Sequence, residues 1–199
     1  MSVVNDNDSS MDSKYYFDNA NIFCLEGKYE EAIVYYNKAI ELAPNYTDAY
    51  NGRGKAKNDL GKYEDSIKDY DMAIELDHNY TYAYNNRGLA KDYLGEYEEA
   101  IKDYDKAIEL DSDYSDAYNN RGIVKNVLGK YEDSIKDYDK AIELNPNNGA
   151  FYNNRGVSKE NLEEYNEALK DYKKALELDP NYDIARENIK EIQDKYGLK

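Results

Sequence analysis

Apolar residues recur along this chain at the spacing of helices rather than of strands. In one stretch they fall at Tyr63, Ile67, Tyr70 and Ile74, which lie on a single face of a helix. Glycine, or a cluster of proline, asparagine and aspartate, separates each such segment from the next, and these residues end one helix or cap the following one. No stretch alternates with a period of two. The pattern predicts an all-α protein built from short helices.

The helical segments belong to a repeat of constant length. The motif Tyr84-Asn85-Asn86-Arg87-Gly88 returns as Tyr118–Gly122 and as Tyr152–Gly156, with a degenerate copy at Tyr50–Gly54. The spacing is 34 residues, as the numbers 50, 84, 118 and 152 show, and this is a known period of stacked helix-turn-helix arrays. The five repeats are 13–46, 47–80, 81–114, 115–148 and 149–182. Residues 1–12 are predicted to be a disordered tail, and 183–199 a C-terminal capping helix.

Small and aromatic residues alternate at fixed places in the repeat. The eighth position is small in every copy: Ala20, Gly54, Gly88, Gly122, Gly156. The twenty-fourth position is always tyrosine: Tyr36, Tyr70, Tyr104, Tyr138, Tyr172. We expect the small residues to let two antiparallel helices approach closely and the rings to fill the space beside them. Glycine ends the first helix of four repeats, whereas Glu163 stands there in the fifth, where we expect some strain.

This pattern resembles the tetratricopeptide repeat family over residues 13–182. The resemblance implies two antiparallel helices per repeat, stacked into a right-handed superhelical solenoid whose concave groove is lined by the first helices. The chain departs from the family at two positions of repeats two to five. The seventh position, usually leucine, is arginine, and the eleventh, usually aromatic, is lysine.

The arginines at the seventh position need a partner, because an unpaired charge at a helix seam is costly. The same four repeats carry aspartate at the twenty-third position, which lies near the seventh in an antiparallel helix pair. We therefore predict Arg–Asp pairing within each of these repeats. Arginine as a ligand contact is the alternative.

Paired asparagines form the candidate binding surface. They flank the first-helix tyrosine and resemble the asparagine ladder in the repeat domain of O-linked N-acetylglucosamine transferase, whose amides can bond a peptide backbone. Apolar residues stand beside them on the same helices. The candidate peptide-binding groove is Asn85, Asn86, Leu89, Asn119, Asn120, Ile123, Asn153, Asn154 and Val157. A merely solvated helix face is the alternative interpretation of the asparagines, and we expect ligand contact to be strongest from repeat three to repeat five.

Composition narrows the possible functions. The net charge of −16 disfavours nucleic acid and anionic membranes as partners. A single cysteine, Cys24, and a single histidine, His78, leave no disulfide, no multi-cysteine metal site and little acid–base chemistry. No phosphate-cradling loop or catalytic constellation is present, so we expect no enzyme activity, no metal and no cofactor. The absence of a signal-peptide pattern or a long apolar run favours a cytoplasmic protein.

Two functions remain in competition. The leading hypothesis is a non-catalytic protein–protein interaction module, an adaptor or scaffold, that holds an extended peptide or a helix in the concave groove. Its partner is expected to be neutral to basic, because Lys14 and Lys55 are the only clear bases of the groove. That scarcity also argues against a carboxylate clamp for chaperone tails. The alternative is a structural subunit that self-associates through its terminal repeats, so a monomer or a weak homodimer is expected.

Overall fold

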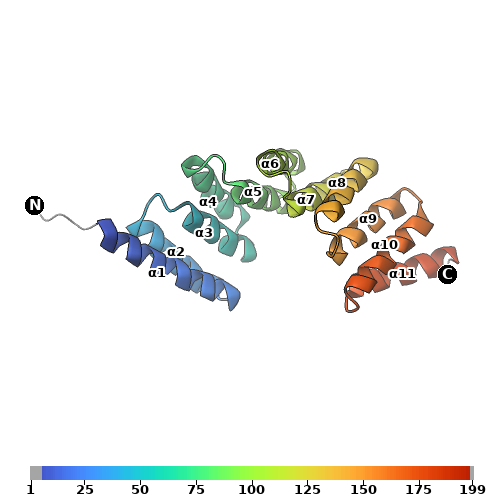
Figure 1. Ribbon diagram of the computed structural model, residues 1–199, viewed down its shortest axis with the longest axis horizontal. Helices are drawn as coiled ribbons and strands as arrows, with labels where there is room; N and C mark the ends of the chain where they lie inside the picture. Colours follow the sequence, from blue (N-terminus) through green and yellow to red (C-terminus); the bar gives the residue numbers. More distant parts are fainter. Residues whose placement is uncertain (1–5, 198–199) are drawn as a thin grey trace, which may run out of the picture. The chain divides into compact units, whose positions relative to one another are not determined.

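The computed structural model describes residues 6–197. This part of the chain contains eleven helices and no strand (Figure 1). The helices are α1 (Asp6–Leu25), α2 (Tyr29–Leu42), α3 (Thr47–Asp59), α4 (Tyr63–Leu76), α5 (Thr81–Tyr93), α6 (Tyr97–Leu110), α7 (Ser115–Val127), α8 (Tyr131–Leu144), α9 (Gly149–Asn161), α10 (Tyr165–Leu178) and α11 (Asp183–Tyr196). The prediction of an all-α fold with two helices per repeat is confirmed. No described helix has the length and apolar character needed to cross a bilayer.

The chain divides into two compact units, Met1–Lys106 and Ala107–Lys199. In the first unit each helix from α1 to α5 packs against the next, and in the second the same holds from α7 to α11. The first helices of neighbouring repeats also touch each other: α1 contacts α3, and α7 contacts α9. This serial packing follows from the sequence, because each repeat buries its apolar face against its neighbours.

The N-terminal boundary differs from the prediction. Helix α1 begins at Asp6 rather than near residue 13, so residues 6–12 of the expected tail are helical, and residues 1–5 lie outside the described part. Lengthening an existing helix adds one hydrogen bond for each residue fixed, whereas starting a helix is costly. The packed part of α1 therefore extends toward the N-terminus at little cost.

The close helix crossings occur where the small residues were predicted to allow them. The ring of Tyr138 is buried against Gly122, and a Cβ atom at Gly122 would lie 2.7 Å from Cε1 of that ring. Gly54, Gly88 and Gly156 face the equivalent tyrosines at similar distances. The tyrosines at the twenty-fourth position are the largest fully buried side chains of the described residues. The glycine is therefore a steric requirement of the buried ring.

The turn that ends the first helix adopts a left-handed backbone in every repeat. Gly27, Gly61, Gly95 and Gly129 have φ between 72° and 77°, and Glu163 has φ 63°. A residue with a Cβ atom pays for this conformation, whereas glycine does not. Glu163 thus adopts the left-handed conformation for which strain was predicted.

The C-terminal helix packs as a cap on the last repeat. Ala185 and Ile192 of α11 are completely buried, and Ile192 packs with Ala168 and Tyr172 of α10. Ile184, in contrast, is exposed.

Candidate functional site

Four buried ion clusters occupy the seam between the two helices of repeats two to five. In each, an arginine of the first helix donates two hydrogen bonds to an aspartate of the second. For Arg121 and Asp137 the Nε–Oδ2 distance is 3.0 Å and the Nη2–Oδ1 distance is 2.6 Å. The other pairs are Arg53–Asp69, Arg87–Asp103 and Arg155–Asp171. The predicted Arg–Asp pairing is confirmed, so these guanidinium groups bind aspartates within the protein.

A lysine completes each cluster, which the sequence reasoning missed. Nζ of Lys125 lies 2.7 Å from Oδ2 of Asp137, and Lys57, Lys91 and Lys159 make the equivalent contact. The signal was present, because lysine, arginine and aspartate occur in the same four repeats. In repeat one the same places hold Phe23 and Tyr35, whose ring centroids lie 4.9 Å apart. The seam thus accepts either an aromatic pair or an ion cluster.

The arginines also connect neighbouring repeats. Nη1 of Arg87 donates to Asp71 at 2.6 Å, and Nη1 of Arg155 donates to Asp139 at the same distance. Each guanidinium additionally lies over the tyrosine three residues before it, as Arg87 does over Tyr84. Burial alone would lower the pKa of Arg87, but its bonds to Asp103 and Asp71 outweigh burial and raise it. The bonds of Arg87 and Arg155 therefore join each arginine both to its own repeat and to the preceding one.

The asparagine columns form hydrogen bonds between first helices. Nδ2 of Asn86 donates to Oδ1 of Asn51 at 3.0 Å, and Nδ2 of Asn154 donates to Oδ1 of Asn119 at 2.9 Å. Asn188 of α11 continues the series by donating to Asn153. The sixth position of one first helix is therefore tied to the fifth position of the preceding one. The sequence signal for this arrangement was Asn188, because the capping helix also carries an asparagine at its sixth position.

These bonds change the interpretation of the candidate groove. Asn85 and Asn153 are buried, so they cannot form its exposed wall. Asn86, Asn119, Asn120 and Asn154 are half-buried. A side-chain amide offers two donors and two acceptor positions, so a bond to a neighbour does not exhaust the capacity of a half-buried one. The main role of these asparagines is therefore to link the first helices of neighbouring repeats.

Three of the predicted groove residues come together in the second unit. Ile123, Asn154 and Val157 line a pocket of about 140 Å³ with Asn126, Val127 and Tyr138. The pocket lies between the first helices α7 and α9. Leu89 belongs to α5 of the first unit and is half-buried.

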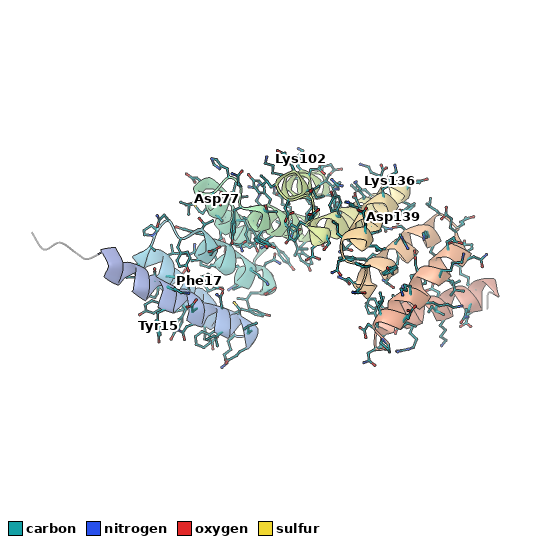
Figure 2. All side chains as sticks on the ribbon, viewed as in Figure 1. Tyr15, Phe17, Asp77, Lys102, Lys136 and Asp139 are labelled. Atoms are coloured by element: carbon teal, nitrogen blue, oxygen red, sulfur yellow. The ribbon has the colours of Figure 1, made fainter. Side chains whose placement is uncertain are left out.

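A larger pocket, of about 480 Å³, lies in the first unit on the face shared by α1 and α3. Its lining is aromatic, apolar, amide and charged: Phe17, Asn21, Cys24, Leu25, Tyr29, Tyr36, Asp48, Asn51, Gly52, Lys55, Asp59 and Tyr80. Figure 2 labels Phe17 on α1. Gly52 stands where later repeats carry the sixth-position asparagine, and it lies directly against the ring of Tyr36. Because Gly52 has no side-chain amide, space remains for the pocket. The pocket therefore lies in repeats one and two, where we expected the weakest contact with a ligand.

The described residues give little support to chemistry at this pocket. Burial raises the pKa of the Cys24 thiol, whose sulfur lies 3.7 Å from the hydroxyl of Tyr36. A raised thiol pKa means less thiolate, the form that acts as a nucleophile. Across residues 6–197, no group of three His, Cys, Asp or Glu side chains is placed to hold a metal ion.

Its stacked two-helix repeats, with pockets on the first helices, place this chain in the class of helical-repeat proteins. The tetratricopeptide repeat model matches residues 81–114, 115–148 and 150–182, and a second TPR repeat model matches 20–58 and 54–91. The chain therefore belongs to the tetratricopeptide repeat family. No curated protein sequence matched it.

Several solved structures share the fold. MamA is 30% identical, with 81% of this chain and 94% of that chain covered and a TM-score of 0.71. TTC0263, a thermophilic TPR protein in Thermus thermophilus, is 18% identical, with coverages of 90% and 98% and a TM-score of 0.77. The first TPR of Spaghetti (RPAP3), bound to HSP90 peptide SRMEEVD, is 31% identical, with coverages of 60% and 95% and a TM-score of 0.59.

Proposed function

We propose that this chain is a non-catalytic protein-interaction module that holds an extended peptide against its first helices, in the concave groove that the family resemblance implies. The observation that carries the proposal is the hollowing of this face in both units. The pockets of α1 and α3 and of α7 and α9 both combine apolar walls with amide groups. Such a lining suits a peptide, because apolar surface supplies affinity and amides satisfy the peptide backbone.

The related first TPR of Spaghetti (RPAP3), with its bound HSP90 peptide, supports a peptide as the class of partner. The charge of the partner is expected to differ. That peptide, SRMEEVD, has more acidic residues than basic ones, whereas the larger pocket here has Asp48 and Asp59 against Lys55 alone. We expect a neutral to basic partner. In the first unit, the half-buried Asn86 and Leu89 of α5 would add to the contact. In the second unit, Asn120, Asn154, Ile123 and Val157 would make a contact of their own.

Random-peptide display on the full chain tests this function. Enriched peptides are synthesised, and their affinity is measured for the chain and for an Ile123→Lys/Val157→Lys variant. The matched control is Glu132→Gln/Glu143→Gln, which changes the net charge by the same amount at exposed residues of the second helix α8. Weaker binding by the groove variant alone supports the proposal. Enrichment of no peptide would exclude it. So would binding that is unchanged in the groove variant, in alanine variants of Asn86 and Asn154, and in Leu25→Lys at the larger pocket.

A second candidate, self-association through the first repeat, rests on a different observation. Tyr15 and Ile22 are 60% and 51% exposed, although the third and tenth positions they occupy are buried in repeats two to five. Figure 2 labels Tyr15 on α1. The buried equivalents are Ala49, Ala83, Ala117 and Phe151, and Ala56, Ala90, Val124 and Ser158. Sedimentation over a dilution series tests this alternative: a dimer abolished by Ile22→Lys favours it, and a monomer at every micromolar concentration opposes it.

A further inference from the structure

The pocket between α1 and α3 has an apolar floor with an acidic residue toward each end. Phe17 packs against the rings of Tyr46 and Tyr36, at centroid distances of 4.9 and 5.9 Å. Leu25 and Tyr29 continue the apolar surface. Leu25 is 89% exposed, so it offers apolar area that a bound chain can cover.

The spacing of the acids fits a short extended segment. Asp48 and Asp59 lie eleven residues apart on α3, in its first and last turns. At 1.5 Å per residue this separates their backbones by about 16 Å along the helix axis. An extended peptide rises about 3.3 Å per residue. About five peptide residues therefore span the pocket.

The two carboxylates differ in how they are satisfied. Asp48 accepts a hydrogen bond of 2.5 Å from the hydroxyl of Tyr80. Asp59 has Lys55, one helical turn away, as its nearby cation, and the described residues provide no hydrogen bond to its carboxylate. Burial raises the pKa of Asp59, and Lys55 only partly offsets this effect. Burial raises the pKa of the Cys24 thiol and of the Tyr36 and Tyr80 hydroxyls, so these groups of the wall stay neutral near pH 7. Asp59 is thus the carboxylate that a new cation would stabilise most.

We propose that this pocket selects a peptide segment of about five residues in which a lysine or arginine pairs with Asp59 and an apolar side chain covers Phe17 and Leu25. The inference rests on the proposed peptide-binding function and specifies its ligand at repeats one and two. A cation from the peptide would form the charge-assisted bond that Asp59 lacks. Lys55 competes for the same carboxylate, so the exchange is between an internal cation and an external one.

The test uses immobilised full-length chain and pools of end-blocked octapeptides. One position of each pool is fixed as arginine, lysine, citrulline or glutamate, and the other positions are mixtures of uncharged residues. Citrulline has the shape of arginine without its charge. The chain is compared with Asp59→Asn, with Lys55→Gln, and with Glu64→Gln, which removes one exposed acid from α4 and serves as a charge-matched control. Thermal melts establish that each variant is folded.

We expect the wild-type chain to retain the arginine pool about two- to fivefold better than the citrulline pool, because Asp59 is exposed and an ion pair in contact with water is partly screened. This preference should disappear in Asp59→Asn, increase in Lys55→Gln and persist in Glu64→Gln. If arginine and citrulline are retained equally, or if the preference survives in Asp59→Asn or is lost equally in Glu64→Gln, the pocket assignment is wrong while peptide binding stands. If no pool is retained, both proposals fail.

Discussion

The guanidinium of Arg121 and the carboxylate of Asp137 face each other across the two helices of one repeat, joined by hydrogen bonds of 3.0 and 2.6 Å. The aspartate is buried and also contacts Lys125. Ionic groups in such a place are stable only together, because each neutralises a charge that has been removed from water. In repeat one the positions of Lys125 and Asp137 hold Phe23 and Tyr35, so an aromatic contact there takes the place of the lysine–aspartate contact.

Arg121→Met should destabilise the fold by about 1–3 kcal/mol, because Asp137 loses two charge-assisted hydrogen bonds but keeps its contact with Lys125. Asp137→Asn should cost about 3–5 kcal/mol, because it removes the carboxylate that both cations share. The double variant should cost less than the sum. Urea unfolding of the four proteins gives the coupling energy. A coupling energy indistinguishable from zero would show that the two side chains contribute independently.

Gly122→Leu should cost about 1–3 kcal/mol, because even its Cβ would overlap the fully buried ring of Tyr138. Asn120→Ala serves as the comparison on the same helix. Asn120 is half-buried, so its truncation should cost about 1 kcal/mol or less. Thermal melts rank the two variants, and equal melting temperatures would contradict the assignment of helix faces.

The sequence was sufficient to predict the fold, because all five repeats show the same pattern of packing residues. A glycine opposite a buried tyrosine, as at Gly122 and Tyr138, is visible as two columns at constant spacing. The site was less predictable. Asparagine columns could equally bond a peptide or each other, and only coordinates show that Asn86 donates to Asn51. The pocket at Gly52 was missed because it arises from an absent side chain.

Glu163→Gly should stabilise the protein by about 1 kcal/mol. Glu163 has φ 63°, in the left-handed region where glycine serves in the other four repeats, and a Cβ atom costs about 1–2 kcal/mol there. Part of this gain is offset because glycine has more freedom in the unfolded chain. Chemical denaturation measures the change, with Glu164→Gly as a control at the adjacent residue. A loss of stability in Glu163→Gly would show that its side chain makes a compensating contact.

Asp92→Asn should raise stability at pH 7, and the gain should shrink in acid. Burial raises the pKa of Asp92 above its usual range, so the folded state binds the proton more readily than the unfolded chain does. Stability is therefore lost as the pH rises from the unfolded pKa, about 4, through the folded pKa. Melting temperatures of both proteins between pH 3 and pH 7, at about 1-unit intervals, follow this change. A difference that is independent of pH would mean that Asp92 acts through packing instead of charge.

Asp92→Glu should stabilise the chain by a different route, through Tyr104. The hydroxyl of Tyr104 is buried and finds no hydrogen-bond partner among the described residues. In repeat five the same two positions hold Glu160 and Tyr172, and Tyr172 donates to Glu160 at 2.8 Å. The aspartate is one methylene shorter than the glutamate, which accounts for the missing bond at Tyr104. Lengthening it should supply an acceptor and gain about 1 kcal/mol. The gain should vanish when Tyr104 is replaced by phenylalanine, and an equal gain in the Tyr104→Phe background, measured by urea unfolding, would refute the proposed bond.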